Sequence, residues 1–273
     1  MINQSIQRVL SIFVAAFALV GALLVTLPAQ ADINPGEGLP ETVTADALPT
    51  VQINGVVWDQ HIVGDTVYVG GQFTLARPAG AAAGVNEVSR QNLLAYNLHT
   101  GELINSWAPV ANAQVKSISS NADGSVVYVA GSFTQINGTN RGRVAALDPV
   151  TGELKANITT GFDSTINSVY WTPDAIYVGG HFTKGGSTPR QRVAAISPVN
   201  GAVLPFNPII PNHNVQAIIA NPAGDKIAIG GAFTSVNGSN NPGYGLVLVD
   251  AATGKTNLPL AANSLIRNGG DKA

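Results

Sequence analysis

The segment Val67-Tyr68-Val69-Gly70-Gly71-Gln72-Phe73-Thr74 is one of four versions of the same pattern in this sequence. The other three are Val127-Tyr128-Val129-Ala130-Gly131-Ser132-Phe133-Thr134, Ile176-Tyr177-Val178-Gly179-Gly180-His181-Phe182-Thr183 and Ile227-Ala228-Ile229-Gly230-Gly231-Ala232-Phe233-Thr234. The pattern recurs roughly every 50 to 60 residues, and periods of about 40 to 50 residues in a β-rich chain match one four-stranded propeller blade. The first interval is longer because of an insertion between Leu75 and Thr100. The sequence therefore predicts an all-β propeller of about four four-stranded repeats.

The turn residues divide each repeat into short strands. In the second repeat, β-branched and aromatic residues predict strands over 115–119, 126–133 and 144–147, and a weaker one over 153–158. The last two are joined by Asp-Pro-Val-Thr-Gly, where the aspartate can bond the backbone two residues on and the glycine can adopt a left-handed conformation. Related turns occupy 97–101, 197–201 and 250–254. We expect the best-defined turn residues to be Asp148, Gly152, Asp250 and Gly254.

The glycine pairs and phenylalanines of the repeated motif are expected to shape the contacts between blades. The apolar runs lack a clean alternation, which indicates strands covered on both faces. A glycine pair inside a strand usually marks a bulge or a close backbone approach, and we expect a neighbouring blade to pack there. The phenylalanines are interpreted as wedges between blades. These structural residues are Gly70, Gly71, Phe73, Gly131, Phe133, Gly179, Gly180, Phe182, Gly230, Gly231 and Phe233.

The repeat resembles a known family. Its marks are the Y-V-G-G-x-F-T core, the loop Ile136-Asn137-Gly138 or Val236-Asn237-Gly238, the stretch 143–148 and the Thr-Gly-Glu-Leu turn. Together they resemble the delta-sixty type of β-propeller repeat of secreted bacterial, especially actinobacterial, proteins, over nearly the whole chain after residue 31. The resemblance implies a fold and export but no defined chemistry. Similar proteins continue through further blades, whereas 263–273 ends where a fifth first strand is expected.

Ring closure leaves two interpretations open. A propeller must close, because an open series leaves an apolar blade face and unpaired strand edges exposed. Either this chain is a truncated piece of a longer propeller, or it forms a small ring in which residues 43–54 or 261–267 supply a missing strand. The predicted blades are approximately 51–110, 111–160, 161–210 and 211–260, with the start of a fifth over 261–273.

The N-terminus has the pattern of an export signal. Arg8 precedes an uncharged, mostly apolar run from Val9 to Leu27, followed by Pro28 and the Ala29-Gln30-Ala31 cleavage pattern. We predict a signal peptide over 1–31 and a linker over 32–50, and hence a secreted or cell-envelope protein. The apolar run is also long enough to span a bilayer, so an uncleaved anchor is the alternative.

Composition excludes several classes of protein. The 273 residues carry a formal net charge of −2, which gives no basic field for nucleic acid. The absence of cysteine excludes disulfides, thiolate metal sites and cysteine nucleophiles. The 45% hydrophobic content is too high for a disordered chain. No G-x-S-x-G elbow, H-E-x-x-H, P-loop or EF-hand motif occurs.

The remaining polar and aromatic residues suggest only weak sites. The histidines lack metal-pair spacing and are spread over three of the repeats, and they are His61, His99, His181 and His213. The carboxylates outside the turn pattern, which could line one mouth of a ring, are Asp59, Asp163 and Asp174. Two interpretations are open for the loops 137–140 and 237–241: their Asn side chains bind calcium, or the loops are ordinary solvated turns. Two interpretations are also open for four arginines: they form a small basic stripe on adjacent blades, or they are solvated loop residues. They are Arg141, Arg143, Arg190 and Arg192.

The tryptophans are Trp58, Trp107 and Trp171. Trp107 is interpreted as a packing residue between blades. The alternative, a quinoprotein docking segment, fits poorly because the other repeats have Ile158, Phe206 and Leu258 in that region.

We therefore predict no catalytic, cofactor-binding or metal-binding residue and no enzyme activity. The chain is expected to be a binding or structural module for an extracellular protein or carbohydrate, without nucleic acid or stable membrane insertion. The alternative is a fragment of a secreted hydrolase or quinoprotein-like oxidoreductase. Converging carboxylates in a pocket would favour that alternative, whereas an uncharged or aromatic groove is expected of a binding module.

Overall fold

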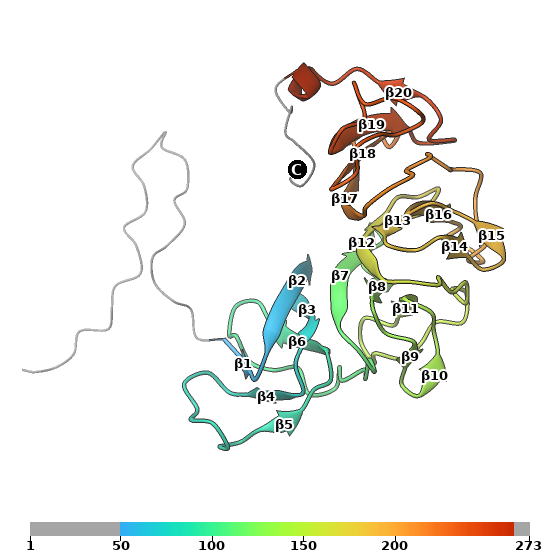
Figure 1. The fold of residues 1–273 in the computed structure, drawn as a ribbon. Coiled ribbons are helices and arrows are strands. Elements are labelled where there is room, and N and C mark those ends of the chain that lie inside the picture. The colour runs from blue at the N-terminus through green and yellow to red at the C-terminus, as the bar shows by residue number, and fades with distance from the viewer. Residues whose placement is uncertain (1–49, 265–273) are drawn as a thin grey trace, which may run out of the picture. The chain divides into compact units, whose positions relative to one another are not determined.

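The computed structural model describes residues 50–264 (Figure 1). The predicted signal peptide, nearly all of the predicted linker and residues 265–273 lie outside this part. Within it, no helix is long and apolar enough to cross a membrane.

The described chain is built of antiparallel sheets, confirming the predicted all-β propeller fold. Blade 1 contains β2 (Val56–Val63), β3 (Thr66–Gln72) and β6 (Leu93–Asn97). Blade 2 contains β7 (Val115–Ser120), β8 (Val127–Gly131) and β11 (Val144–Leu147). Blade 3 contains β12 (Ile166–Trp171), β13 (Ile176–Gly180) and β16 (Val193–Ile196). Blade 4 contains β17 (Val215–Ala220), β18 (Lys226–Gly231), β19 (Leu246–Asp250) and β20 (Asn257–Leu258).

Short strands lie between the second and third strands of the first three blades, and one precedes blade 1. They are β1 (Gln52–Ile53), β4 (Leu75–Arg77), β5 (Val88–Ser89), β9 (Gln135–Ile136), β10 (Thr139–Asn140), β14 (Lys184–Gly185) and β15 (Thr188–Pro189). A 3-10 helix, η1 (Ala261–Ser264), follows blade 4.

The predicted fourth strand is complete only in blade 4. In blades 1 to 3 it is reduced to single bridges, namely Tyr96 with Leu103, Leu147 with Leu154, and Ile196 with Val203. In these three blades the segment after the turn packs apolar side chains against the core without forming a ladder, as Leu103, Leu154 and Val203 do.

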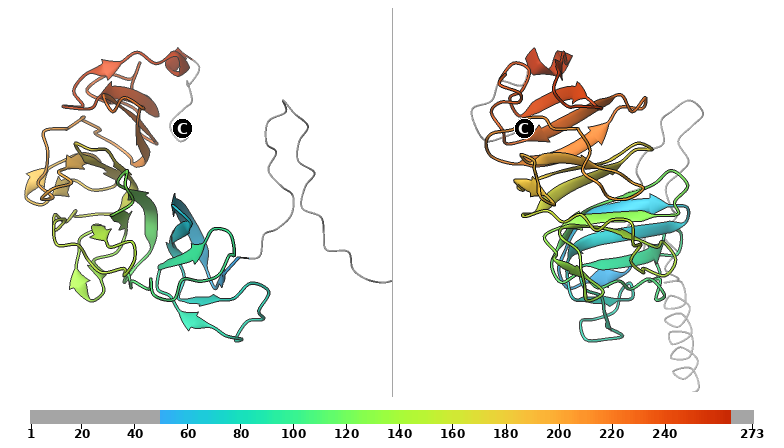
Figure 2. Two further views of the ribbon diagram at one scale, coloured as in Figure 1. Left: turned by 180° about the vertical axis from the view of Figure 1, so that it is seen from behind. Right: turned by 90° about the vertical axis from the view of Figure 1, so that its right-hand side faces the viewer.

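The inner strands bring the blades together in sequence order. β2 contacts β7, β7 contacts β12, and β12 contacts β17 (Figures 1 and 2). Each inner strand has a register shift near its start, a β-bulge, where one extra residue faces a glycine pair or its Ala-Gly equivalent.

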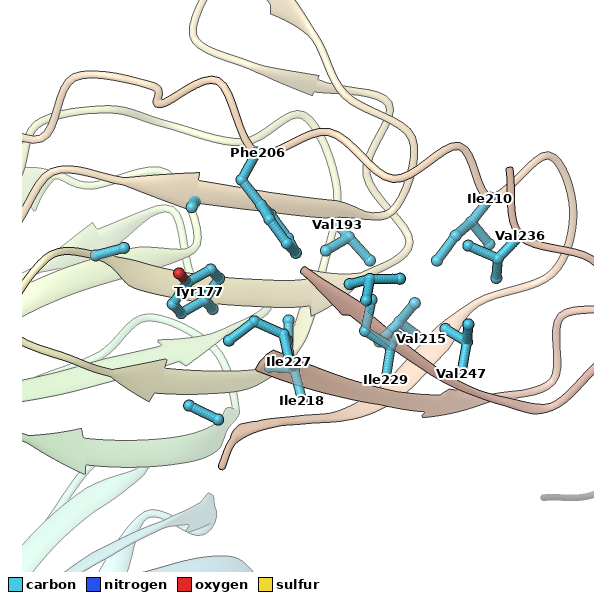
Figure 3. Packing of buried hydrophobic residues seen from close by; sticks show 14 of the residues in the cluster. Tyr177, Val193, Phe206, Ile210, Val215, Ile218, Ile227, Ile229, Val236 and Val247 are labelled. Atoms are coloured by element: carbon cyan, nitrogen blue, oxygen red, sulfur yellow. The ribbon is translucent and has the colours of Figure 1, made fainter. Parts of the chain in front are cut away.

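Apolar clusters fill the junctions between blades. Between blades 3 and 4, Tyr177 and Phe206 pack against Val215, Ile227 and Ile229 (Figure 3). Corresponding clusters at the two earlier junctions include Trp107 with Phe133, and Ile158 with Phe182. Both faces of β8, β11, β13 and β16 are buried, which explains why their sequences do not alternate.

The two glycines of each pair have different roles. A Cβ on Gly70 would lie 2.8 Å from Cγ1 of Val115 in the next blade, so this position faces the neighbour as expected. A Cβ on Gly71 would instead collide with the backbone oxygen of Val56 in the same blade. Gly131, Gly180 and Gly231 make the same approach to their own inner strands. The first glycine of the pair therefore lies where the neighbouring blade packs, and the second accommodates the bulge of its own inner strand.

Neither segment proposed to complete a small ring does so in the described residues. β1 pairs with β4 of blade 1, and residues 261–264 form η1. No described residue of 261–273 is in a strand, so the predicted start of a fifth blade is not seen in this part of the chain.

Candidate functional site

One groove is lined by the ends of all four inner strands and the turns that follow them. It has a volume of about 510 Å³. Its lining includes His61, Ile62, Ser119, Ser120, Asn121, Tyr170, Trp171, Thr172, Pro173, Ala220, Asn221 and Pro222. We call it the inner-strand groove. Because these segments are far apart in sequence, only the side-by-side arrangement of the blades brings them together.

Contacts between blades position the polar groups of the groove. Nε2 of His61 lies 2.9 Å from Oγ of Ser120 in the next blade. Oγ of Ser119 accepts a hydrogen bond of 3.2 Å from the backbone N–H of Trp171 in the blade after that. Hydrogen bonds between neighbouring blades therefore fix the polar side chains of the groove in position.

Two adjacent aromatic residues form the apolar part of the groove. Tyr170 and Trp171 are consecutive in β12, so their side chains point to opposite faces of the sheet. Tyr170 packs against the cluster between blades 3 and 4, and Trp171 against the cluster between blades 2 and 3. Both remain partly exposed. Each ring is therefore fixed by packing and still accessible.

The inner-strand groove is electrically neutral. No Asp, Glu, Lys or Arg is among its lining residues, all of which belong to the described part of the chain. Burial lowers the pKa of His61, and the nearby charge of Asp59 offsets this only in part. The imidazole is therefore uncharged at neutral pH.

A second hollow lies at the other end of the inner strands of blades 1 and 2, and its amides are engaged in the fold. Asn54 Oδ1 accepts hydrogen bonds of 2.9 Å from the backbone N–H groups of Thr74 and Leu75. Asn112 and Asp163 make the same clamp in the next two repeats, and Asn212 accepts the one backbone N–H group of Thr234 in the fourth. These side chains fasten each inner strand to its own blade.

The predicted carboxylates do not gather at one mouth. Asp59 accepts a hydrogen bond of 2.7 Å from the backbone N–H of Ile118, and Asp163 belongs to the clamp. Asp174 lines a pocket of about 450 Å³ with Asp225 and Asp250. Partial burial acts to raise the pKa of Asp250, but hydrogen bonds from Thr253, Thr256 and Gly254 outweigh it and lower the pKa to about 2. A general acid needs a raised pKa, so Asp250 is suited to its turn instead.

The histidines other than His61 are separate from the groove. His99 pairs with Asp65 at 3.0 Å, and His181 lies 3.0 Å from Asn214. His213 supplies its backbone oxygen to Arg192. Among the described residues, no group of three or more His, Asp or Glu side chains is arranged to hold a metal ion.

The loop asparagines and the arginines named from the sequence mostly form hydrogen bonds with backbone groups. Oδ1 of Asn137 accepts from the N–H of Val110, and its Nδ2 donates to the carbonyl of Gly152. Asn237 repeats both bonds, with Ile209 and Gly254. The guanidinium groups donate to backbone carbonyls at Arg141, Arg143, Arg190 and Arg192.

The three tryptophans have different environments. Trp107 is 1% exposed, and its Nε1 donates a 3.0 Å hydrogen bond to the carbonyl of Asp148 in the next blade. Trp58 is 51% exposed at the bulge of β2, with Nζ of Lys116 6.0 Å from its ring centroid. Trp171 is the one of these three tryptophans that lines the inner-strand groove.

Comparisons with known proteins concern the fold. The model of a domain of unknown function (DUF5122) β-propeller matches residues 121–154. The WD40 β-propeller domain of Doa1 is 15% identical, with a TM-score of 0.45 over 65% of this chain and 48% of that one. Kuenenia stuttgartiensis hydrazine synthase is 13% identical, with a TM-score of 0.46 over 78% of this chain and 51% of that one. For the β-propeller domain of Myceliophteria thermophila Cps50 (Swd1), the identity is 13% and the TM-score 0.48, over 78% of this chain and 58% of that one.

The chain thus spans about half the length of the solved structures just described. No curated protein matches its sequence significantly. The family match and the antiparallel blades identify a β-propeller chain and assign no chemistry to it.

Sequence reasoning singled out His61 and Trp171 but did not place them together. The available signal was the alignment of the repeats. The two positions at the end of each inner strand are His61-Ile62, Ser119-Ser120, Tyr170-Trp171 and Ile219-Ala220. They differ in every repeat, whereas the motif that follows them is nearly constant.

Proposed function

We propose that this protein is an exported binding module that takes a neutral carbohydrate chain in the inner-strand groove. The observation that carries the proposal is the lining of the groove, which combines two fixed aromatic rings with hydroxyl and amide groups and has no formal charge at neutral pH. Aromatic faces pack on the apolar faces of sugar rings, while hydroxyl and amide groups hydrogen-bond their hydroxyls. Export by residues 1–31 would place the module where such polymers occur.

An enzymatic role is less well supported by the same residues. The carboxylate pocket contains Asp250, whose oxygens bind turn N–H groups, and it lies beside a different blade junction from His61. A neutral groove fits binding better than acid–base catalysis.

The binding proposal is tested by calorimetric titration of the exported, purified chain with soluble β-glucan and dextran, and with alginate as a charged polymer. We expect one of the neutral polymers to bind and alginate not to bind. Trp171→Ala should weaken binding at least tenfold. Trp58→Ala is the matched control, because Trp58 is an exposed tryptophan outside the groove.

Because Trp171 also packs against a core cluster, Tyr170→Phe provides a second test that removes only a hydroxyl group. A smaller loss of affinity with an unchanged melting temperature is expected. Preference for alginate, absence of binding to every neutral polymer, or unchanged binding by Trp171→Ala would each overturn the proposal. Export is tested separately: the chain recovered from the medium should begin at Asp32.

A further inference from the structure

Blade 4 has one sheet face that no other described blade covers. In β18 and β19, Ile227, Ile229, Val247 and Val249 are fully buried against blade 3, and three of them are labelled in Figure 3. The strand register places the intervening residues on the opposite face. We call this the blade-4 face. Its apolar residues are Ala217, Ile219, Ala228, Gly230, Leu246 and Leu248, and the register also places the pair Lys226 and Asp250 at the end of the face next to the turn 221–225.

The same face of an earlier blade receives the inner strand of the next blade. A Cβ on Gly179 would collide with Val215, and one on Gly70 would lie 2.8 Å from Val115. At Gly230, which occupies the equivalent position, no atom lies within 4 Å of such a Cβ. Beside this hollow stands Ile219, whose relative exposure is 53%. The blade-4 face therefore combines a hollow with an exposed apolar side chain.

The blade-4 face also lacks the polar groups that bind a following blade. At the first three junctions, an inner-strand side chain accepts a hydrogen bond from a backbone N–H of the next blade. The pairs are Asp59 with Ile118 at 2.7 Å, Ser117 with Val169 at 3.1 Å, and Ser168 with Ile218 at 3.2 Å. Ala217 is the fourth residue of this series and has no acceptor in its side chain.

A second polar contact is missing in the same place. Tyr68 and Tyr177 each reach a backbone carbonyl of the following blade, and Ala228 stands at their position in the repeat. Another blade of this type would leave its inner-strand N–H unpaired against Ala217, which is unfavourable. An apolar surface that presents no such N–H group fits better.

We propose that the blade-4 face binds the same face of a second copy of this chain across a two-fold axis. The apolar parts of two identical faces leave no inner-strand N–H group unpaired, and the exposed Lys226 lies at the end of each face, outside the apolar part. A two-fold contact requires only that the surface be complementary to itself. Ile219 of each copy packs into the hollow over Gly230 of the other. This repeats, between copies, the contact that Val115 makes over Gly70 within the chain.

Light scattering after size exclusion, on the exported and purified chain over a range of concentrations, tests the proposal. The expected mass is that of a dimer which dissociates on dilution. Ile219→Asp should weaken the dimer at least tenfold, because it would bury an unpaired carboxylate, and should leave the melting temperature of the monomer unchanged. Gly230→Val fills the hollow and is expected to have the same effect without adding a charge.

Two control variants sharpen the result. Val199→Asp places the same charge on a turn residue that is 80% exposed and should leave the dimer intact. Val57→Asp changes an exposed residue of blade 1 and should also have no effect. A monomer at every concentration, open-ended aggregates, a dimer that survives Ile219→Asp, or a dimer lost in Val57→Asp would each overturn the two-fold contact.

Discussion

The hydroxyl group of Tyr68 in blade 1 donates a 2.8 Å hydrogen bond to the carbonyl of Pro149 in blade 2. The Tyr68 ring also meets Trp107 edge-on, with centroids 4.9 Å apart. Tyr177 repeats the arrangement between blades 3 and 4, bonding the carbonyl of Ala251 at 3.0 Å with its ring edge-on to Phe206. In blades 1 and 3 the tyrosine of the repeated motif thus joins its blade to the turn of the next one.

Replacing Tyr68 with phenylalanine should lower the free energy of unfolding by about 1 kcal/mol, because the ring stays packed while one hydrogen bond is lost. Urea denaturation of wild type and Tyr68→Phe measures the difference. Tyr96→Phe is the control, since its hydroxyl bonds the exposed side chain of Gln60 in the same blade. Its cost should stay below about 0.5 kcal/mol, and equal costs for the two variants would contradict a special role at the junction.

The glycines facing the next blade should differ sharply in their tolerance of a side chain. Gly179→Val would force a Cβ into Val215 and should cost about 1–3 kcal/mol or more. Gly230→Val meets no atom within 4 Å and should change stability by less than about 0.5 kcal/mol. Both are measured by chemical denaturation at concentrations where the chain is monomeric. A large loss in Gly230→Val would mean that this position is covered within one chain.

The strands could be predicted because their signals are local. The expected strand over 144–147 coincides with β11, and that over 115–119 differs from β7 by one terminal residue. The expected strand over 126–133 was too long, since β8 ends at Gly131. Phe133 continues the apolar run but packs into the core outside the ladder. The apolar character of a residue does not show whether it lies in the strand ladder or packs into the core beyond the end of the strand.

The role of each glycine and the location of the groove depend on register. A bulge in each inner strand shifts which side chains share a face, so Gly70 faces blade 2 while Gly71 faces its own strand. No pattern in a single repeat contains that shift. His61 and Trp171 come together only after three blades have been placed side by side, which is why they were named separately from the sequence.

The turn carboxylate Asp250 should make stability depend on acid pH. Its folded pKa of about 2 lies below the value of about 3.9 usual for an unfolded chain, so its contribution is present above pH 4 and is lost as the pH falls toward 2. The difference in unfolding free energy between wild type and Asp250→Ala should therefore shrink between about pH 4 and pH 2. Ser197 holds the equivalent position in blade 3 and does not titrate in this range, so the deficit of Ser197→Ala should be independent of pH.

The series of inner-strand acceptors predicts a local effect at one backbone amide. Oγ of Ser168 accepts a hydrogen bond of 3.2 Å from the backbone N–H of Ile218, a residue that is 4% exposed. Ser168→Ala leaves this partly buried N–H without its acceptor and should cost about 1–2 kcal/mol. Amide hydrogen exchange provides a residue-specific measurement: exchange at Ile218 should accelerate by about tenfold or more, since about 1.4 kcal/mol corresponds to a factor of ten. Ser187→Ala, on an exposed turn, should leave that rate unchanged. If Ile218 exchanged equally slowly in Ser168→Ala, the serine would not be what protects this amide, and the argument drawn from Ala217 at the blade-4 face would lose its basis.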